Sequence, residues 1–352
     1  MGKRIAMMGT GALGGYVGGY LAHNGQDVTL IDMWPDNIEA IRARGLELDG
    51  VTPEEKFTVR NAKTLHIDDM RTLAGQKPFD IVFISVKSYD TERVTKAILP
   101  YLAPGGYAVS LQNCINEDKI EAVVGPGRTL GVIASIISVE LYGAGRIRRM
   151  AAKGGAKHTV FRVGEMGGRP SERAQELASF FSLIDSTKVT ANLGGERWSK
   201  LIQNGMRNGV SAASGLTGAG CDRDDVLRRF AIRLGGEGVR VAQALGYKLE
   251  KLGELAPDRL ARASEGDAEA LAEVEEIMIS RTASNPRAGI QRPSMAQDMA
   301  KGRRTEIEFM NGYIAEKGRQ AGIPTPANEK LVDIVLRVER GELKPSPGNF
   351  SL

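Results

Sequence analysis

A lysine and two asparagines recur at intervals of four residues in the segment 198–212, WSKLIQNGMRNGVSA. At 100° per residue, Lys200, Asn204 and Asn208 fall with Ser211 within a sector of about 80° on one helix. Apolar side chains occupy the opposite side, namely Trp198, Ile202, Met206 and Val210. A solvated face normally mixes charges of both signs, whereas this one carries a single cation and a row of amides and hydroxyls. The stripe therefore faces either water or something polar that the protein holds.

If this face lines a cleft beside a dinucleotide site, which the glycine motif described below predicts, these residue types suit the reduction of a carbonyl group by a nicotinamide. Hydride transfer to a ketone leaves oxyanion character on the oxygen, and a positioned donor must supply a proton there. Lys200 can donate this proton, the more readily when it is partly desolvated. The amides of Asn204 and Asn208 can hold a substrate hydroxyl. We predict that Lys200 is the general acid; the alternative is a solvated lysine on a surface helix.

A second anomaly is the carboxylate of Glu306 in the segment TEIEFMNGYI. On a helix through this segment, Glu306 lies at the centre of an apolar sector formed by Ile307, Phe309, Met310, Tyr313 and Ile314. A carboxylate on such a face needs a partner or a proton, and Lys200 or a ligand hydroxyl is the candidate partner. Glu308, on the other side of the helix, is expected to form a capping box with Thr305.

A glycine motif near the start of the chain predicts a dinucleotide site. Gly9, Gly11 and Gly14 spell G-x-G-x-x-G between an apolar run at 3–9 and a helical segment. The first glycine permits a tight turn, the second lets the backbone approach a pyrophosphate, and the third allows close packing of helix on strand. The helix N-terminus adds N–H donors and positive potential. The predicted cofactor loop comprises Gly9, Thr10, Gly11, Ala12, Leu13 and Gly14.

The residue that ends the next predicted strand bears on the choice of cofactor. Asp32 closes the apolar run 27–32. A carboxylate at this place accepts hydrogen bonds from the adenosine ribose and repels a 2′-phosphate. The sequence therefore favours NAD(H), with NADP(H) left open. A turn residue before Pro35 is the alternative interpretation of Asp32.

Two further polar residues follow predicted strands at the sheet edge where open α/β folds bind ligands. Lys87 ends the run 79–87; it either contacts the cofactor or ends a strand in solvent. Gln112 and Asn113 close the next strand, and their amides either hold the nicotinamide ribose or a substrate oxygen, or cap a loop.

The order of these segments predicts an α/β domain at residues 1–190, followed by an all-α domain at residues 191–352. Strands alternate with helices in the first part, which implies a parallel sheet covered on both faces. "RTLGVIASIISVEL" and "HTVFRVGE" are expected to extend that sheet. In the second part the periodic segments are helical, at 195–213, 223–246, 256–280, 295–322 and 327–341.

Composition excludes several other classes of protein. The chain has 352 residues, 42% of them hydrophobic and 26% charged, with a net charge of +4; this mild positive balance suits a small anionic ligand and does not indicate nucleic-acid binding. Two cysteines and three histidines, all isolated, indicate a reducing, cytoplasmic setting and no metal site. No apolar run reaches the roughly 18–20 residues that span a bilayer, so no membrane association is expected.

With these residues in place, the chain resembles the ketopantoate reductase (2-dehydropantoate 2-reductase) family over nearly its whole length. The matching segments are GTGALGG, VKSYDT, LQNCINED, RWSKLIQNGMRNGVSA, PSMAQDMAKGRRTEIEFMNG and GIPTPAN. The resemblance implies a Rossmann-type dinucleotide-binding domain and a helical domain like that of 6-phosphogluconate dehydrogenase, with the active site between them. It further implies reduction of a 2-oxo acid to a 2-hydroxy acid. A homodimer is the oligomeric state that we expect.

The same resemblance assigns roles to individual residues. The family's catalytic lysine falls at Lys200, its active-site glutamate at Glu306 and its cleft asparagine at Asn113. Its substrate-binding asparagines fall at Asn204 and Asn208, and its substrate serine at Ser294; the segment SMAQ also fits a capping box that begins at Ser294.

The chain departs from the family pattern at identifiable positions. LQNC replaces the usual LQNG, which places Cys114 where a glycine is common. Gly209 stands where a proline is common, and Asp32 differs from the basic or neutral residue of members that use NADP. One alternative is an NAD-dependent dehydrogenase of the same family that oxidises another hydroxy acid. Others are the β-hydroxyacid and 6-phosphogluconate dehydrogenase group and a non-catalytic dinucleotide sensor.

Overall fold

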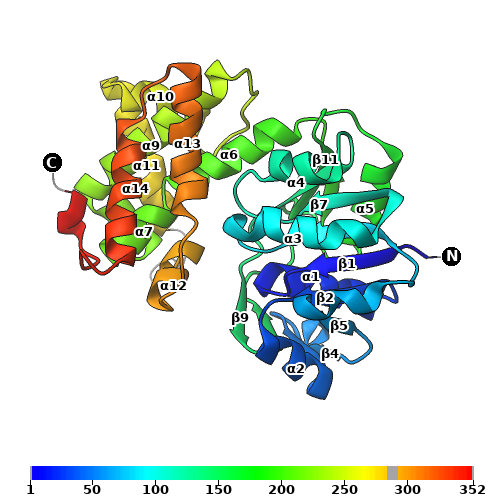
Figure 1. Cartoon of the computed structure of the whole chain (residues 1–352). Coiled ribbons are helices and arrows are strands. Elements are labelled where there is room, and N and C mark those ends of the chain that lie inside the picture. The colour runs from blue at the N-terminus through cyan, green and yellow to red at the C-terminus, as the bar shows by residue number, and fades with distance from the viewer. Residues whose placement is uncertain (1, 284–291, 351–352) are drawn as a thin grey trace. The chain divides into compact units, whose positions relative to one another are not determined.

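The computed structural model describes residues 2–283 and 292–350. The chain divides into two compact units, residues 1–193 and 194–352 (Figure 1). The first unit is α/β and the second is helical, as predicted. Within the described residues, no helix is both long enough and apolar enough to cross a membrane.

A sheet of eight strands forms the centre of the first unit. Its strand order is β12-β11-β8-β7-β6-β1-β2-β5. The strands are β1 (Arg4–Met8), β2 (Asp27–Asp32), β5 (Lys63–His66), β6 (Phe79–Ile84), β7 (Leu102–Ser110), β8 (Thr129–Ala134), β11 (Phe161–Glu165) and β12 (Thr187–Val189). β11 pairs antiparallel with β8 and parallel with β12, whereas the other neighbours are parallel. The sheet is therefore mixed, and the prediction of a parallel sheet is wrong at this edge.

Helices cover both faces of this sheet, because its central strands are apolar on both sides. In β1, Ile5 and Met7 belong to one buried cluster, while Ala6 and Met8 belong to the other. The first cluster includes side chains of α1 and α5, and the second includes side chains of α3 and α4. The helices are α1 (Ala12–His23), α2 (Pro35–Arg44), α3 (Thr91–Ile98), α4 (Glu117–Val124) and α5 (Glu172–Ser182).

A second, smaller sheet was not predicted from the sequence. Its strand order is β4-β3-β10-β9, and it packs against α1. The strands are β3 (Leu46–Asp49), β4 (Phe57–Val59), β9 (Val139–Gly143) and β10 (Arg146–Arg149). Each has five residues or fewer, which is too short for a clear alternation of apolar and polar residues.

The second unit consists of helices, several of them shorter than predicted. They are α6 (Leu193–Gly205), α7 (Asn208–Ser214), α8 (Gly218–Arg223), α9 (Asp225–Ala244), α10 (Pro257–Ser264), α11 (Ala268–Ala283), α12 (Ser294–Ala300), α13 (Ile307–Ala321) and α14 (Pro326–Glu339). The predicted helices 195–213, 256–280 and 295–322 each form two helices instead of one. Gly266 and Gly302, with φ of 96° and 63°, follow the ends of α10 and α12, since glycine adopts this left-handed conformation without steric cost.

Candidate active site

The glycines of the first loop have the geometry that their proposed roles require. Gly9 has φ of 97°, and a Cβ there would lie 2.8 Å from a methyl group of Val86. A Cβ on Gly14 would lie 2.1 Å from the carbonyl oxygen of Gly9, so a larger residue would push α1 away from the loop. A Cβ on Gly11 would meet nothing within 4 Å. The backbone at Gly11 is thus open to a ligand, while its two neighbours in the motif are tightly packed.

The rest of the loop leads into the first turn of α1. The helix begins at Ala12, which lies half-buried beside Leu13. The N–H groups of a first helical turn have no partner within the helix and carry positive potential. Asn37 holds the loop in place: its Nδ2 donates to the hydroxyl of Thr10 at 2.8 Å, and its Oδ1 accepts from the N–H of Gly145 at 2.7 Å. This role of Asn37 cannot be predicted from the sequence, because a buried asparagine in a helix gives no signal by itself.

The carboxylate of Asp32 already receives four donors from its own unit. Oδ2 accepts the N–H of Thr10 at 2.5 Å and also the Thr10 hydroxyl. Oδ1 accepts the N–H groups of Met33 and Trp34, at 2.7 and 2.9 Å. The turn role that the sequence left open is therefore real. A carboxylate offers about four acceptor positions, so a ribose hydroxyl would have to share or displace one of these donors.

The polar residues that follow β6 and β7 lie at the carboxyl edge of the sheet. Lys87 is half-buried and precedes a short 3₁₀ turn at Ser88–Asp90. Gln112 serves the loop: its Nε2 donates to the Val86 carbonyl at 2.7 Å and to the Thr91 hydroxyl at 2.8 Å. Asn113 is half-buried, and its carbonyl accepts from Asn116 at 3.1 Å. A cofactor role for Lys87 and Asn113 stays a prediction.

Two segments at this edge hold non-glycine residues in the left-handed conformation. Cys114, buried next to Asn113, has φ of 62°. After β8, Ile136 and Ser138 have φ of 57° and 44°, and the Ile136 side chain is 66% exposed. Backbone bonds on either side fix this second segment, from Ser135 N–H to Val160 and from Met150 N–H to the Ser138 carbonyl, both 2.9 Å. A β-branched residue with positive φ is uncommon and tends to occur at functional sites.

The lysine and asparagine stripe of the second unit does not lie on one continuous helix. Lys200 and Asn204 are half-buried on α6, whereas Asn208 is the first residue of α7 and is 7% exposed. Between the two helices the N–H of Arg207 bonds to the Asn204 carbonyl at 3.0 Å, an i→i+3 turn. The prediction of a single helix over 195–213 is thus wrong. Lys200, Asn204 and Asn208 instead lie on either side of a helix break.

The apolar side of the stripe is buried, as predicted. Trp198, Ile202, Met206 and Val210 are all at most 3% exposed. Trp198 packs on the rings of Tyr247 and Tyr313, with centroid distances of 5.6 and 5.7 Å. Ser211, the last member of the polar row, donates its hydroxyl to the Leu216 carbonyl at 2.5 Å. The hydroxyl of Ser211 therefore stabilises a turn.

Glu306 is buried, but not on a helix face. It is 6% exposed and immediately precedes α13 as its N-cap, without a side-chain capping bond. The helix starts late because the N–H and hydroxyl of Thr305 both bind Glu339, at 2.9 and 2.7 Å. Glu308 pairs with Arg304 at 2.8 Å. The predictions of Glu306 at the centre of an apolar helix face and of a Thr305–Glu308 capping box are therefore wrong, whereas the buried carboxylate remains.

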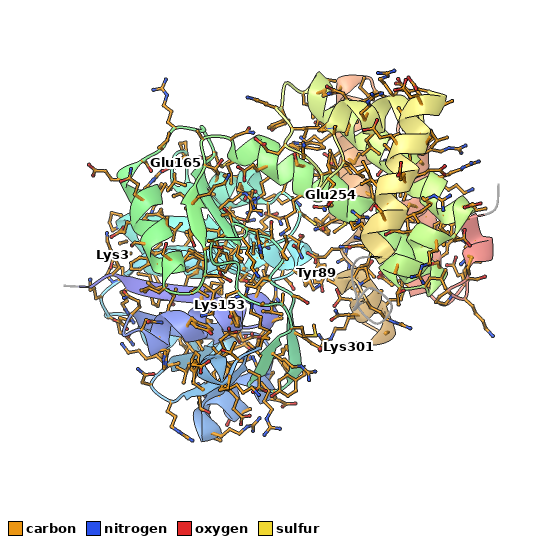
Figure 2. All side chains as sticks on the ribbon, turned by 180° about the vertical axis from the view of Figure 1, so that it is seen from behind. Lys3, Tyr89, Lys153, Glu165, Glu254 and Lys301 are labelled. Atoms are coloured by element: carbon orange, nitrogen blue, oxygen red, sulfur yellow. The ribbon has the colours of Figure 1, made fainter. Side chains whose placement is uncertain are left out.

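Ser294 begins α12, a helix that packs against α7 and so lies beside the helix of Asn208 (Figure 1). Its side chain is exposed, and Pro293 is the N-cap, without a side-chain capping bond. The Gln297 amide donates to the Arg292 carbonyl at 3.0 Å, so the predicted SMAQ capping box is wrong. Lys301, labelled in Figure 2, ends this helix as its C-cap. Ser294 is thus an exposed residue at the start of a helix that packs on α7.

Comparison with known proteins places these features in a family. Residues 5–160 match the family described as ketopantoate reductase PanE/ApbA, and residues 192–339 match its C-terminal domain. The chain belongs to the ketopantoate reductase family. It is accordingly an NAD(P)-dependent oxidoreductase that acts on an alcohol or its keto counterpart, and the predicted Rossmann-type and helical domains are confirmed.

Relatives of known name match the chain over almost its whole length. A 2-dehydropantoate 2-reductase from Archaeoglobus fulgidus is 29% identical over 96% of this chain and 99% of its own. The crystal structure of a PanE/ApbA family ketopantoate reductase from Ralstonia eutropha JMP134 is 28% identical, has a TM-score of 0.76 and covers 96% of this chain and 99% of its own. D-mandelate dehydrogenase, solved with NADH and anilino(oxo)acetate, is similar in fold, with a TM-score of 0.78 at 21% identity, covering 96% and 98%.

Proposed function

We propose that this protein reduces a 2-oxo acid to a 2-hydroxy acid, as a 2-dehydropantoate 2-reductase does. The observation that carries the proposal is the grouping of Lys200, Asn204 and Asn208 about one helix break, in a unit that also buries the carboxylate of Glu306. The names of relatives that match almost the whole chain support the same reaction.

In the proposed reaction a reduced nicotinamide, when bound, supplies a hydride to the carbonyl carbon. Lys200 Nζ donates a proton to the carbonyl oxygen, so that the ketone gains one hydride and one proton. The amides of Asn204 and Asn208 hydrogen-bond the substrate oxygens, and the Ser294 hydroxyl donates to its carboxylate. The buried carboxyl group of Glu306 orients the ammonium of Lys200 or a substrate hydroxyl.

The proposed coenzyme site is the loop from Gly9 to Gly14, with Asp32, Lys87 and Asn113 at the same sheet edge. The open space at Gly11 and the N–H groups at the start of α1, which have no partner within the helix, fit a pyrophosphate. Whatever its hydrogen bonds, the negative charge of Asp32 disfavours a 2′-phosphate, and we infer a preference for NAD(H) over NADP(H). A homodimer stays a prediction.

The role of Lys200 can be tested with one substitution and a matched control. We expect Lys200→Ala to lower kcat at least about 10²-fold, the usual scale for a general acid, with NADH binding unchanged. Lys344→Ala, which removes an exposed lysine of the same unit, should leave kcat unchanged. Absorbance at 340 nm with ketopantoate and other 2-oxo acids measures turnover, and NADH fluorescence measures binding. Unaltered turnover of Lys200→Ala would falsify the assigned role.

The second candidate function is NAD-dependent oxidation of a different hydroxy acid by the same residues. Asp32 favours it specifically, because NAD commonly serves oxidation and the carboxylate disfavours NADP. Hydroxy acids with NAD, in the same absorbance assay, distinguish the two functions. Rapid oxidation of NADH by ketopantoate supports the reductase; turnover confined to another hydroxy acid supports the dehydrogenase.

A further inference from the structure

The break between α6 and α7 leaves a buried carbonyl that a side chain of another helix takes up. In a continuous α-helix the carbonyl of Gly205 would accept the N–H of the residue four positions later. Here the helix ends at Gly205, and Nδ2 of Asn311 on α13 donates to this carbonyl at 3.1 Å. Asn311 is 0% exposed. A side-chain amide thus replaces the helical bond that the break removes.

The same amide is fixed by a buried network that reaches two further helices. Nδ2 of Asn311 also donates to Oδ1 of Asn328, at 2.8 Å. Nδ2 of Asn328 donates in turn to the carboxylate of Glu237 on α9, at 2.8 Å, and to the Leu234 carbonyl, at 3.2 Å. Asn328 is 0% exposed and Glu237 is 5% exposed.

Glu237 completes the network at the first turn of α14. Its two carboxylate oxygens accept the N–H groups of Ala327 and Asn328, at 2.9 and 3.0 Å. All hydrogen bonds of this network are buried. A polar group that loses its partner in such surroundings destabilises the fold. The orientation of the Asn311 amide is therefore set by helices α9 and α14 rather than by solvent.

We propose that Asn311 is a positioning residue for substrate binding: it holds the break that separates Asn204 from Asn208. Without the Asn311 bond, the Gly205 carbonyl would regain a partner most easily by extending α6 through the break. Such an extension would rotate the Asn208 amide relative to Asn204. The inference rests on the proposed function of these two asparagines, and it adds a residue that does not itself touch substrate.

The glycine at position 205 is consistent with this role. A Cβ there would lie 3.2 Å from Nδ2 of Asn311 and 3.5 Å from a methyl group of Ile314. The first distance is tighter than ordinary contact, so an alanine would displace the amide by a few tenths of an ångström. Gly205→Ala therefore perturbs the same bond from the other side without removing a polar group.

The test compares Asn311→Leu and Gly205→Ala with Ile334→Val, a buried substitution on α14 that removes no polar atom. We expect both network variants to raise KM for the 2-oxo acid about 10-fold or more, since small displacements of binding groups have large effects. The dissociation constant of NADH should stay unchanged in all three variants. If Asn311 and Gly205 had only a structural role, a network variant and Ile334→Val with the same loss of melting temperature would have the same KM for the 2-oxo acid.

A second measurement does not depend on turnover. Hydrogen–deuterium exchange of the peptide spanning 203–212 should be altered in Asn311→Leu and Gly205→Ala and unchanged in Ile334→Val. Gly205→Ala keeps the assay informative if Asn311→Leu fails to fold. Unchanged exchange in this peptide overturns the inference. Absence of wild-type turnover with every oxo and hydroxy acid refutes the proposed function instead, and the exchange measurement still decides the role of Asn311.

Discussion

Cys114 shows how a single residue can carry a conformational cost at the candidate site. Its φ of 62° lies in the left-handed region, where a Cβ costs roughly 1–2 kcal/mol. Glycine would avoid this cost, because it adopts the left-handed conformation without steric strain. The backbone at this position therefore has the left-handed conformation that favours glycine, although the residue here is a cysteine.

We expect Cys114→Gly to be more stable than Cys114→Ala by about 1 kcal/mol. Both variants lose the thiol, but only alanine keeps the left-handed strain. At ordinary positions the order is reversed, because glycine loses more backbone entropy on folding. Urea denaturation followed by circular dichroism gives the free energy of unfolding for each variant. If alanine is equal or better, Cys114 is not strained.

At the residue scale, the sequence could identify side chains whose type is unusual for their surroundings. Glu306 is such a side chain, since its carboxyl group lies among apolar residues, and it is buried as expected. Its position before the helix could not be predicted, since the late start of α13 depends on Thr305 binding Glu339, 34 positions away. Asn311 was not recognised, because a buried asparagine is distinctive only once its partners are known.

At the scale of elements, periodicity predicted which segments are helical but not where they break. Met206 and Val210 continue the apolar pattern of Ile202 across the break, and all three are buried. The partner that makes the break tolerable is Asn311, 106 positions from Gly205. A pattern within one segment contains no information about such a distant partner.

The connection between β2 and the glycine loop gives a prediction about coenzyme choice. Asp32→Ala removes the negative charge and the acceptor for Thr10, so we expect weaker NADH binding and at least about a 10-fold rise in the ratio of kcat/KM for NADPH to that for NADH. Asn37→Ala is the matched control, because it also loosens Thr10 but leaves the charge unchanged. Steady-state kinetics with both coenzymes measures the ratio.

The two variants separate the two roles of the carboxylate. Loss of loop order alone should weaken the binding of NADH and NADPH alike and leave the ratio of their kcat/KM values unchanged, as we expect for Asn37→Ala. If Asp32→Ala behaves in the same way, Asp32 is a residue of the turn and does not select the coenzyme.

At the scale of the whole molecule, the two units position the residues of the proposed reaction by different kinds of contact. The α/β unit holds its loops at the edge of a sheet that is buried on both faces. The helical unit uses buried polar groups between helices, as at Asn311 and Glu237. The sequence predicted the first arrangement, since apolar strands and glycines are local signals. The second depends on contacts between distant helices.

A buried ion pair links the smaller sheet to the connection between α5 and β12, and it makes the stability of the α/β unit depend on pH. Nη2 of Arg149, the last residue of β10, lies 2.6 Å from Asp185, which precedes β12, and both side chains are at most 1% exposed. Burial opposes ionisation of Asp185, but the N–H groups of Ser186 and Gly154 and the Arg149 guanidinium outweigh it. The pKa of Asp185 therefore lies below its ordinary value.

Because this pKa is lower in the folded state than in the unfolded chain, the pair stabilises the fold above about pH 4, and that stability is lost as pH falls through the folded pKa.

We expect Asp185→Asn to lower the free energy of unfolding by about 3–5 kcal/mol at pH 7, since it leaves Arg149 buried without a counter-charge. The difference in free energy of unfolding between Asp185→Asn and the wild type should become smaller below about pH 4. Asp118→Asn, an exposed control, should show no such convergence. Urea denaturation between pH 7 and pH 3 measures both, and a gap that stays constant through this range contradicts the ionised pair.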